Sequence, residues 1–212
     1  KITVNPGGKL ILNGGTLMVS ECSEGLWQGI ELVGQSNTSQ SLTNMGYASF
    51  ANSAEIRDAK VGLRTGETDE NGYIPGTSGS YFNGNTVTFR NNLMDIKMHP
   101  YENINPIDSS IISDRSACNN CSFISDEALP NNQITAIHIE LDSIVGMEFD
   151  GILIDNQLAQ SILSERSIGV KAYNTTFFIT PFGSTRSEFN TLYRAIDCYT
   201  PNLSYIPSID QA

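Results

Sequence analysis

The chain has 212 residues and carries 12 Lys and Arg against 23 Asp and Glu, which gives a formal net charge of -11. Such an acidic surface repels the phosphates of nucleic acids and the headgroups of anionic lipids, so we expect neither as a partner. No stretch approaches the roughly 18 uninterrupted apolar residues of a spanning helix, so we expect no membrane insertion within this chain. The length suits a single domain over residues 1–212.

Short strands are the elements that the sequence favours. Runs of Val, Ile, Leu, Phe and Thr are separated by Gly, Asn, Ser and Asp, and helical periodicity is nearly absent. One helix is expected at Gln157–Arg166, as a loop excursion. A β-sandwich or jelly roll would show tight hairpins between alternating strands, and the hairpin turn sequence Asn71-Gly72 lies instead inside a predicted loop. The pattern therefore predicts an all-β fold without a hairpin architecture.

An internal repeat organises these strands. Its unit is an apolar residue, a Gly or small residue, an apolar residue, a polar residue and a further apolar or small residue, as in Trp27-Gln28-Gly29-Ile30-Glu31-Leu32. The Gly position recurs at Gly29, Gly62, Asp95, Gly146, Gly169 and, in a degenerate copy, near 195. A constant strand with variable spacing predicts a single-stranded right-handed parallel β-helix, a solenoid with irregular loop excursions. We assign the four glycines a structural role.

Loops and corners follow from the same pattern. The longest loops are expected at Gln35–Ala51, Arg64–Ser80 and Pro100–Ser116. Second strands such as Thr86–Phe89 and Thr176–Ile179 have Asn or Asp beside them. Because Asn tolerates the left-handed backbone of a sharp turn, we expect these residues at corners between strands.

Three stretches resemble a known family. Residues 2–17, 26–32 and 54–63 look like the β-helix repeats of large secreted bacterial surface proteins that share the pectin-lyase-like fold and are frequent in bacteria with type IX secretion. The resemblance implies a secreted, cell-surface location and a structural, adhesive or carbohydrate-binding role within a larger extracellular polypeptide. The implied partners are other domains of that polypeptide and extracellular glycans or proteins.

Charged residues occupy the middle of each repeat strand, where side chains point away from the core. These residues are Glu31, Arg64, Lys97, Glu148, Lys171 and Asp197. A solvated ladder of opposite charges is the favoured interpretation, because exposed ion pairs are common and rarely functional. The expected function is therefore a non-catalytic structural or adhesive segment, with glycan binding as a further option.

An enzyme is the alternative. The resemblance to pectin-lyase-like proteins implies an outward Lys base and acidic partners in a polysaccharide lyase or glycoside hydrolase, and the candidates here are Lys97, Lys171, Glu148 and Asp150. The family's hydrolase signatures, namely Asn-Thr-Asp, a paired Asp-Asp and Gly-His-Gly, do not occur. We therefore assign no catalytic residue in the leading interpretation.

Metal and thiol chemistry have little sequence support. Calcium at Asp150 or Asp155 is left open, although the spacing of an EF-hand loop is missing, and no other cofactor is expected. The pair Cys118 and Cys121 forms a CxxC without the second half of a zinc site or the βαβ setting of a redox motif. A corner disulfide and a buried thiol stack remain the two structural interpretations.

Two further residues have a structural and a functional interpretation. His138 is expected at the surface or at a corner, since no matching acid or nucleophile can be identified in the sequence. Trp27 is expected to pack on the core or to close a loop, with stacking on a sugar as the alternative.

Overall fold

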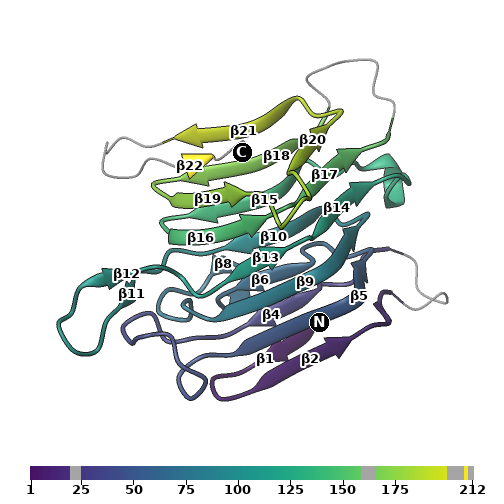
Figure 1. The fold of residues 1–212 in the computed structure, drawn as a ribbon. Helices are drawn as coiled ribbons and strands as arrows, with labels where there is room; N and C mark the ends of the chain where they lie inside the picture. The colour runs from purple at the N-terminus through teal and green to yellow at the C-terminus, as the bar shows by residue number, and fades with distance from the viewer. Residues whose placement is uncertain (20–24, 159–165, 200–207, 210–212) are drawn as a thin grey trace.

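The computed structural model describes residues 1–19, 25–158, 166–199 and 208–209. These residues form an all-β protein, and the helix among them is one short 3-10 turn, η1 (Pro130–Asn132). The strands assemble into two large parallel sheets that face each other across the interior (Figure 1). The helix expected at Gln157–Arg166 falls mainly on 159–165, outside the described residues. The all-β prediction is confirmed.

Seven parallel strands form the first sheet, which we call sheet A. The chain leaves sheet A after every strand and returns to it one strand further along, so neighbouring strands are never consecutive in sequence. In spatial order the strands are β1 (Ile2–Val4), β4 (Ile30–Leu32), β6 (Leu63–Thr65), β10 (Met94–Met98), β15 (Ile137–Asp142), β18 (Ile168–Tyr173) and β21 (Arg194–Tyr199).

Eleven strands form the second sheet, sheet B, and its described pairings are also parallel. We call each turn of the chain through sheet A and sheet B a pass. The long strands β5 and β9 each pair with two shorter strands of the neighbouring pass, so sheet B has two halves that meet at a corner. The strands are β2 (Lys9–Asn13), β3 (Thr16–Leu17), β5 (Tyr47–Arg57), β9 (Tyr81–Arg90), β13 (Ala117–Asn119), β14 (Ser122–Ser125), β16 (Val145–Asp150), β17 (Leu153–Asn156), β19 (Thr176–Thr180), β20 (Glu188–Asn190) and β22 (Ser208–Ile209).

The corner within sheet B repeats the same backbone conformation in successive passes. Gly14, Asn52, Thr86, Asn120 and Gly151 each follow the last residue of the first half and have φ angles of 78°, 55°, 56°, 54° and 59°. This left-handed region suits Gly and Asn, which have the least steric conflict there. The side chains also connect passes, since Asn52 Nδ2 donates to Asn13 Oδ1 at 2.6 Å. Left-handed Asn residues at corners, as predicted, are confirmed at Asn120 and at Asn174, where φ is 47°.

Apolar side chains of both sheets fill the interior. Phe50, Phe89 and Phe123 are register partners or near neighbours in sheet B, and the ring centroids of Phe89 lie 6.5 Å from Phe50 and 5.3 Å from Phe123. On sheet A the aliphatic residues Ile30, Leu63, Ile96, Ile139 and Val170 lie in one register column and are all buried. Identical positions of successive passes thus stack on one another to form a continuous core.

Antiparallel pairing is confined, in the described part of the chain, to two hairpins and one isolated bridge within loops. The hairpin β7 (Thr68–Asp69) with β8 (Gly72–Tyr73) lies in the loop predicted at Arg64–Ser80. The hairpin β11 (Asn103–Ile104) with β12 (Ile111–Ile112) lies in the loop predicted at Pro100–Ser116 and projects from the body of the molecule (Figure 1). The third loop is shorter than predicted, because Tyr47 to Ala51 belong to β5.

No helix among the described residues has the length and apolar content that a membrane crossing requires.

Candidate functional site

The outward residues of sheet A form one register column, which we call the outer column. From strand to strand it contains Thr3, Glu31, Arg64, Lys97, Glu140, Lys171 and Asp197. Five of the six predicted residues lie in this column, but Glu31 is buried and not solvated as predicted. The prediction is wrong for Glu148, which lies on β16 of sheet B. The error arose because Val145–Phe149 matches the repeat, whereas the true copy at Ile137–Leu141 has His138 in the place of Gly.

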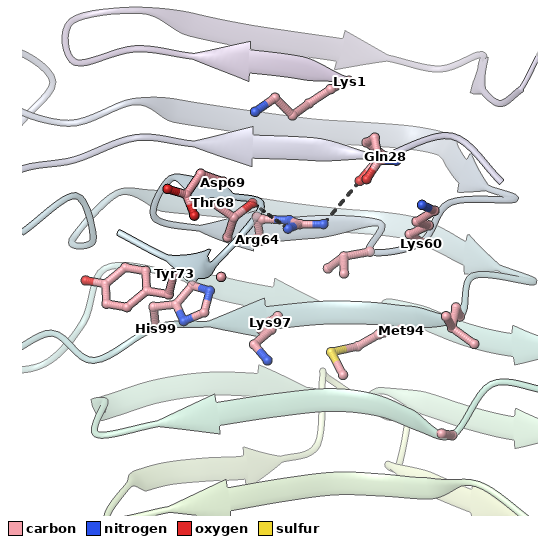
Figure 2. A pocket seen from close by; sticks show the side chains of 14 residues that line it. Lys1, Gln28, Lys60, Arg64, Thr68, Asp69, Tyr73, Met94, Lys97 and His99 are labelled. Atoms are coloured by element: carbon pink, nitrogen blue, oxygen red, sulfur yellow. Dashed lines mark hydrogen bonds between the residues drawn. The ribbon is translucent and has the colours of Figure 1, made fainter. Parts of the chain in front are cut away.

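A groove of about 820 Å³ lies over the first four strands of sheet A (Figure 2). Its floor includes Lys1, Arg64 and Lys97, which come from three different strands or their ends. The hairpin β7–β8 forms one wall, and apolar residues at the entry to the strands, including Met94, line the other. The volume falls within the range of small-molecule sites, so the groove is the candidate binding site.

Two stacked rings form the hairpin wall. The rings of Tyr73 and His99 lie 4.2 Å apart with an interplanar angle of 10°. Gly66, with φ of +98°, permits this arrangement, because a Cβ at that position would lie 2.7 Å from the Tyr73 ring. Burial lowers the pKa of His99 to about 4, and the charges of Lys97 and Arg64 add to the effect. His99 is therefore neutral at pH 7, and its buried Nε2 has no hydrogen-bond partner among the described residues.

Glu31 anchors the hairpin to the floor of the groove. Its carboxylate is 1% exposed and accepts hydrogen bonds from Lys1 Nζ at 2.8 Å, from Thr68 N at 3.1 Å and from Thr68 Oγ1 at 3.0 Å. In the next pass but one, Lys97 Nζ lies 2.7 Å from Glu140 Oε1. The carboxylates of the outer column are thus already engaged by protein donors.

Arg64 lacks such a carboxylate. Its Nη1 donates to Thr68 Oγ1 at 2.7 Å, its Nη2 reaches the carbonyl oxygen of Gln28 at 3.4 Å, and its buried Nε has no partner in the described part of the chain. Burial lowers the pKa of this guanidinium, and the nearby Glu31 charge offsets only part of that effect. Arg64 is therefore a half-buried cation held in position by neutral oxygens.

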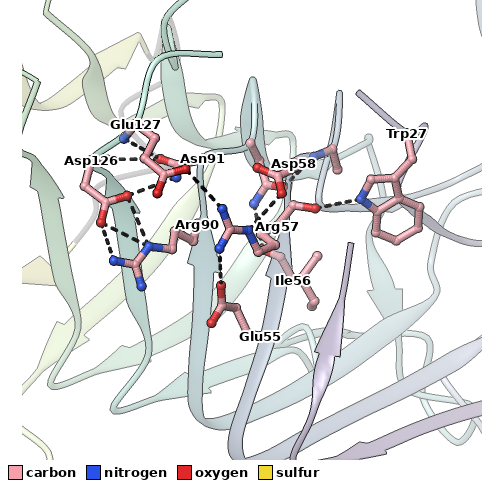
Figure 3. Close-up of polar contacts among 11 residues, drawn as sticks. Trp27, Glu55, Ile56, Arg57, Asp58, Arg90, Asn91, Asp126 and Glu127 are labelled. Atoms are coloured by element: carbon pink, nitrogen blue, oxygen red, sulfur yellow. Dashed lines mark hydrogen bonds and ion pairs between the residues drawn. The ribbon is translucent and has the colours of Figure 1, made fainter. Parts of the chain in front are cut away.

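A second cluster of arginines shows the opposite arrangement (Figure 3). Arg57 and Arg90 are register partners on β5 and β9. Arg57 lies 2.8 Å from Asp58 and 3.3 Å from Glu127, and Arg90 pairs with Asp126, whose pKa is lowered mainly by the hydrogen bond from Arg90. Each guanidinium is neutralised within the protein, so this cluster stabilises the corner of the fold.

Trp27 lies beside this cluster and has a structural role. Its Nε1 donates to the carbonyl oxygen of Arg57 at 2.7 Å, and its half-buried ring packs against the hydrophobic core (Figure 3). The prediction of a core-packing role is confirmed.

The residues named for an enzymatic alternative are distributed over both sheets. Lys97 lies in the groove, whereas Lys171 lies two strands further along, with its Nζ 5.1 Å from the ring centroid of Tyr173. Glu148 and Asp150 line a separate depression of about 300 Å³ on sheet B, together with Phe178 and Thr180. The fold does not bring the four candidates into one site.

The calcium candidates lie on β16 and β17, which follow one another in sequence but belong to the two halves of sheet B, and each accepts a hydrogen bond from a protein donor. Asp150 accepts a hydrogen bond from Thr180 Oγ1, and Asp155 accepts one from Gln157 Nε2 at 3.0 Å. Within the described ranges, no group of three or more His, Cys, Asp or Glu side chains is arranged to hold a metal ion.

Cys118 and Cys121 are buried free thiols on either side of the sheet B corner. Both sulfur atoms face Gly84 of the preceding pass, where an added Cβ would lie 3.0 Å from Cys121 Sγ and 3.6 Å from Cys118 Sγ. Burial raises the pKa of the Cys118 thiol, which disfavours the reactive thiolate. The structure thus has the buried thiol pair, one of the two interpretations left open by the sequence.

His138 is fully buried, so its predicted place at the surface is wrong. Its Nδ1 lies 2.6 Å from Asp95 Oδ2, and Asp95 Oδ1 accepts a hydrogen bond from Asn92 Nδ2 at 2.9 Å. Each member of this pair comes one residue before a member of the buried aliphatic column of sheet A. We call the column of these preceding residues the inner column, and its other members are Gly29, Gly62, Gly169 and Ala195. The acid that the sequence did not reveal is therefore the Asp in the Gly place of the preceding repeat.

The repeat glycines have tight surroundings in this inner column. An added Cβ at Gly29 would lie 1.7 Å from the backbone carbonyl oxygen of Val61. At Gly62 and Gly169 it would lie 2.7 Å and 2.4 Å from the backbone carbonyl oxygens of Asp95 and Ala195. Gly146 belongs instead to sheet B, where it coincides with a register shift between β16 and β19.

Comparison with protein-family models, with curated proteins and with solved structures found no match. The functional argument therefore depends on the groove. Sequence reasoning identified Arg64 and Lys97 as outward residues but missed Lys60, Tyr73 and His99 as lining residues. The Asn71-Gly72 turn was the available signal for a hairpin beside the sheet.

Proposed function

We propose that this chain is a non-catalytic, adhesive segment of an extracellular bacterial surface protein, in which a right-handed parallel β-helix forms a rigid rod and presents a glycan-binding groove. The groove over sheet A carries the proposal, because it combines an aromatic wall, an apolar wall and a polar floor in about 820 Å³. Ligand sites commonly have this combination of apolar walls and a few placed polar groups.

The β-helix part of the proposal is supported by register. Strands in both sheets pair in parallel with the equivalent strand of the next pass, as in Ile30 with Leu63 and Leu63 with Ile96. The buried columns of both sheets continue from pass to pass, which is how a solenoid buries apolar side chains that one repeat cannot bury alone.

The extracellular and bacterial parts are supported by composition and by resemblance. The net charge of -11 and the abundance of neutral polar residues suit a secreted all-β protein. Residues 2–17, 26–32 and 54–63 resemble the repeats of surface proteins from bacteria with type IX secretion.

The non-catalytic part is supported by the separation of the candidate catalytic groups. The acidic candidates Glu148 and Asp150 lie on sheet B, whereas the groove lies over sheet A. The Lys97 ammonium is also paired with Glu140 Oε1 at 2.7 Å, so it is engaged by a protein carboxylate.

Incubation of the purified chain with a panel of immobilised and soluble polysaccharides tests this function. We expect retention on at least one glycan and no release of reducing ends or unsaturated products. Turnover at ordinary enzyme rates, about 1 s⁻¹ or faster, would show a catalyst instead. Failure to bind any glycan in a broad panel would refute the adhesive role.

A further inference from the structure

We propose that the groove is selective for acidic saccharides, whose carboxylate or sulfate group binds at Arg64 and Lys60 while the sugar ring lies against Tyr73. This inference rests on the proposed glycan-binding function and names the class of glycan. It is carried by the charges of the lining residues, by the incomplete pairing of Arg64 and by the shape of the walls.

The charge of the groove is opposite to that of the whole chain. Four cationic side chains line it, and among the described residues Asp69 is the one carboxylate in the lining. The lining cations are Lys1, Lys60, Arg64 and Lys97. Lys1 and Lys97 are paired with Glu31 and Glu140, so Lys60 and Arg64 carry the positive charge that has no carboxylate partner among the described residues. This charge attracts an anionic ligand to the groove, whereas the rest of a chain with a net charge of -11 repels it.

The pairing of the arginines indicates where the anion binds. Arg57 and Arg90 each have a carboxylate within ion-pair distance, whereas Arg64 has none among the described residues. A buried donor without an acceptor is costly, and Arg64 Nε is such a donor. A ligand oxyanion at the Nη groups of Arg64 would supply the negative charge that the protein itself supplies to Arg57 and Arg90.

The position of the Arg64 guanidinium is fixed before any ligand arrives. Thr68 Oγ1 holds one end of it, and Thr68 is itself held by Glu31, which ties the arginine to the hairpin. A fixed guanidinium presents planar N–H donors that match a carboxylate or sulfate. Lys60 lies beyond Arg64 on the side away from Tyr73, and it has no ion pair in the described part of the chain, so its ammonium is open to the ligand (Figure 2).

The walls favour a saccharide over other anions. Tyr73 is stacked on His99 and presents a rigid aromatic surface, and Val61, Leu93 and Met94 supply an apolar surface in the same groove. A sugar ring has an apolar face and polar edges, so it can pack on an aromatic ring while its acidic group reaches the cations. The neutral state of His99 at pH 7 leaves the anion to Arg64 and Lys60.

Calorimetric titration of the full chain with alginate, dextran sulfate, neutral dextran and polyglutamate tests the proposal. We expect alginate or dextran sulfate to bind with an affinity that falls as salt rises, and dextran to bind at least tenfold more weakly. The tighter of the two acidic glycans identifies the preferred oxyanion, and binding of either supports the proposal.

Arg64→Gln and Lys60→Gln should each weaken that binding about tenfold or more, because each loses a charged hydrogen bond. Lys9→Gln is the matched control, since Lys9 is an exposed lysine on β2 of sheet B, and it should bind like the wild type. Circular dichroism verifies folding of each variant, and Lys60→Gln changes an exposed side chain, so it tests the site even if Arg64→Gln unfolds.

Equal binding of dextran and alginate would overturn the selectivity while leaving the glycan-binding function in place. Tight binding of polyglutamate would overturn the assignment to saccharides. Unchanged affinity in folded Arg64→Gln and Lys60→Gln would overturn the site. If no glycan binds at all, the proposed function itself fails, which is a separate result.

Discussion

The inner and outer columns of sheet A use charge in different ways. The inner column consists of Gly or Ala except at one point, where Asp95 and His138 are buried and joined by a hydrogen bond. The outer column is charged in nearly every strand, and its members pair with neighbours or with loop groups. A fully buried charged or polar group such as His138 or Glu31 is stable only with its partner, whereas water compensates for a missing partner at the exposed members of the outer column. Charge is therefore structural in the inner column and available for function in the outer one.

The largest expected effect comes from a side chain placed in the inner column. Gly29→Ala places a Cβ 1.7 Å from the Val61 oxygen at a φ of +86°, so we expect a loss of about 4 kcal/mol in the free energy of unfolding. Urea denaturation measures it. Gly25→Ala is the control, because Gly25 also has a positive φ but no atom of the described residues within 4 Å of the added Cβ. Equal losses in both variants would contradict the steric account.

Removal of one buried partner should have the next largest effect. Asp95→Ala removes the partner of His138 Nδ1 in the interior and leaves Asn92 Nδ2 with the carbonyl oxygen of Ile56 alone, and we expect a loss of about 3 kcal/mol in the free energy of unfolding. The double variant Asp95→Ala, His138→Ala should be less destabilised than the sum of the two single variants. Strict additivity in denaturation curves would show that the two side chains do not act as a pair.

The histidine of the outer face should produce a pH dependence. The pKa of His99 is about 4 in the folded protein and ordinarily 6.5, so the unfolded chain binds more protons between these values. Stability from this group is present above pH 6.5 and is lost as the pH falls toward 4. After allowance for solvent screening, we expect the wild type to lose about 2 kcal/mol more free energy of unfolding than a His99→Gln variant between pH 7 and pH 4. A constant difference between the two proteins from pH 7 to pH 4 would contradict this assignment.

The smallest effect is expected for an ion pair of the outer column. Lys97→Met removes the contact with Glu140, which lies 2.7 Å away on the next strand. Because both side chains are partly exposed, we expect a change in unfolding free energy of less than about 1 kcal/mol. A double-mutant cycle with Glu140→Gln gives the coupling. A coupling as large as that of the buried pair would remove the distinction between the columns.

Much of sheet A could be predicted from the sequence, because its apolar and polar residues alternate in a recognisable unit. The exception was the pass at Ile137–Leu141, where His138 replaces the expected glycine. Sequence alone offers no reason for a histidine in that place, since its partner Asp95 comes from another repeat. Asp95 and His138 both replace the glycine of the repeat, and only the strand register shows that these two replacements are partners.

The candidate groove was only partly predictable. Arg64 and Lys97 were identified because alternation fixes which side of a strand they occupy. Tyr73 and His99 were missed, since their positions depend on how a hairpin folds back over the sheet and on the conformation of Gly66. Such contacts depend on loop geometry, on which strand periodicity gives no information.

The parallel register of sheet A has a consequence for how the chain folds. Leu63 pairs with Ile96, and Ile139 pairs with Val170, so sheet hydrogen bonds join residues separated by a whole pass of the chain. A chain dominated by such distant contacts closes long loops before it gains any pairing, which makes folding slow. Once two passes have docked, each new pass pairs with an existing sheet edge, so folding propagates from one pass to the next along the stack.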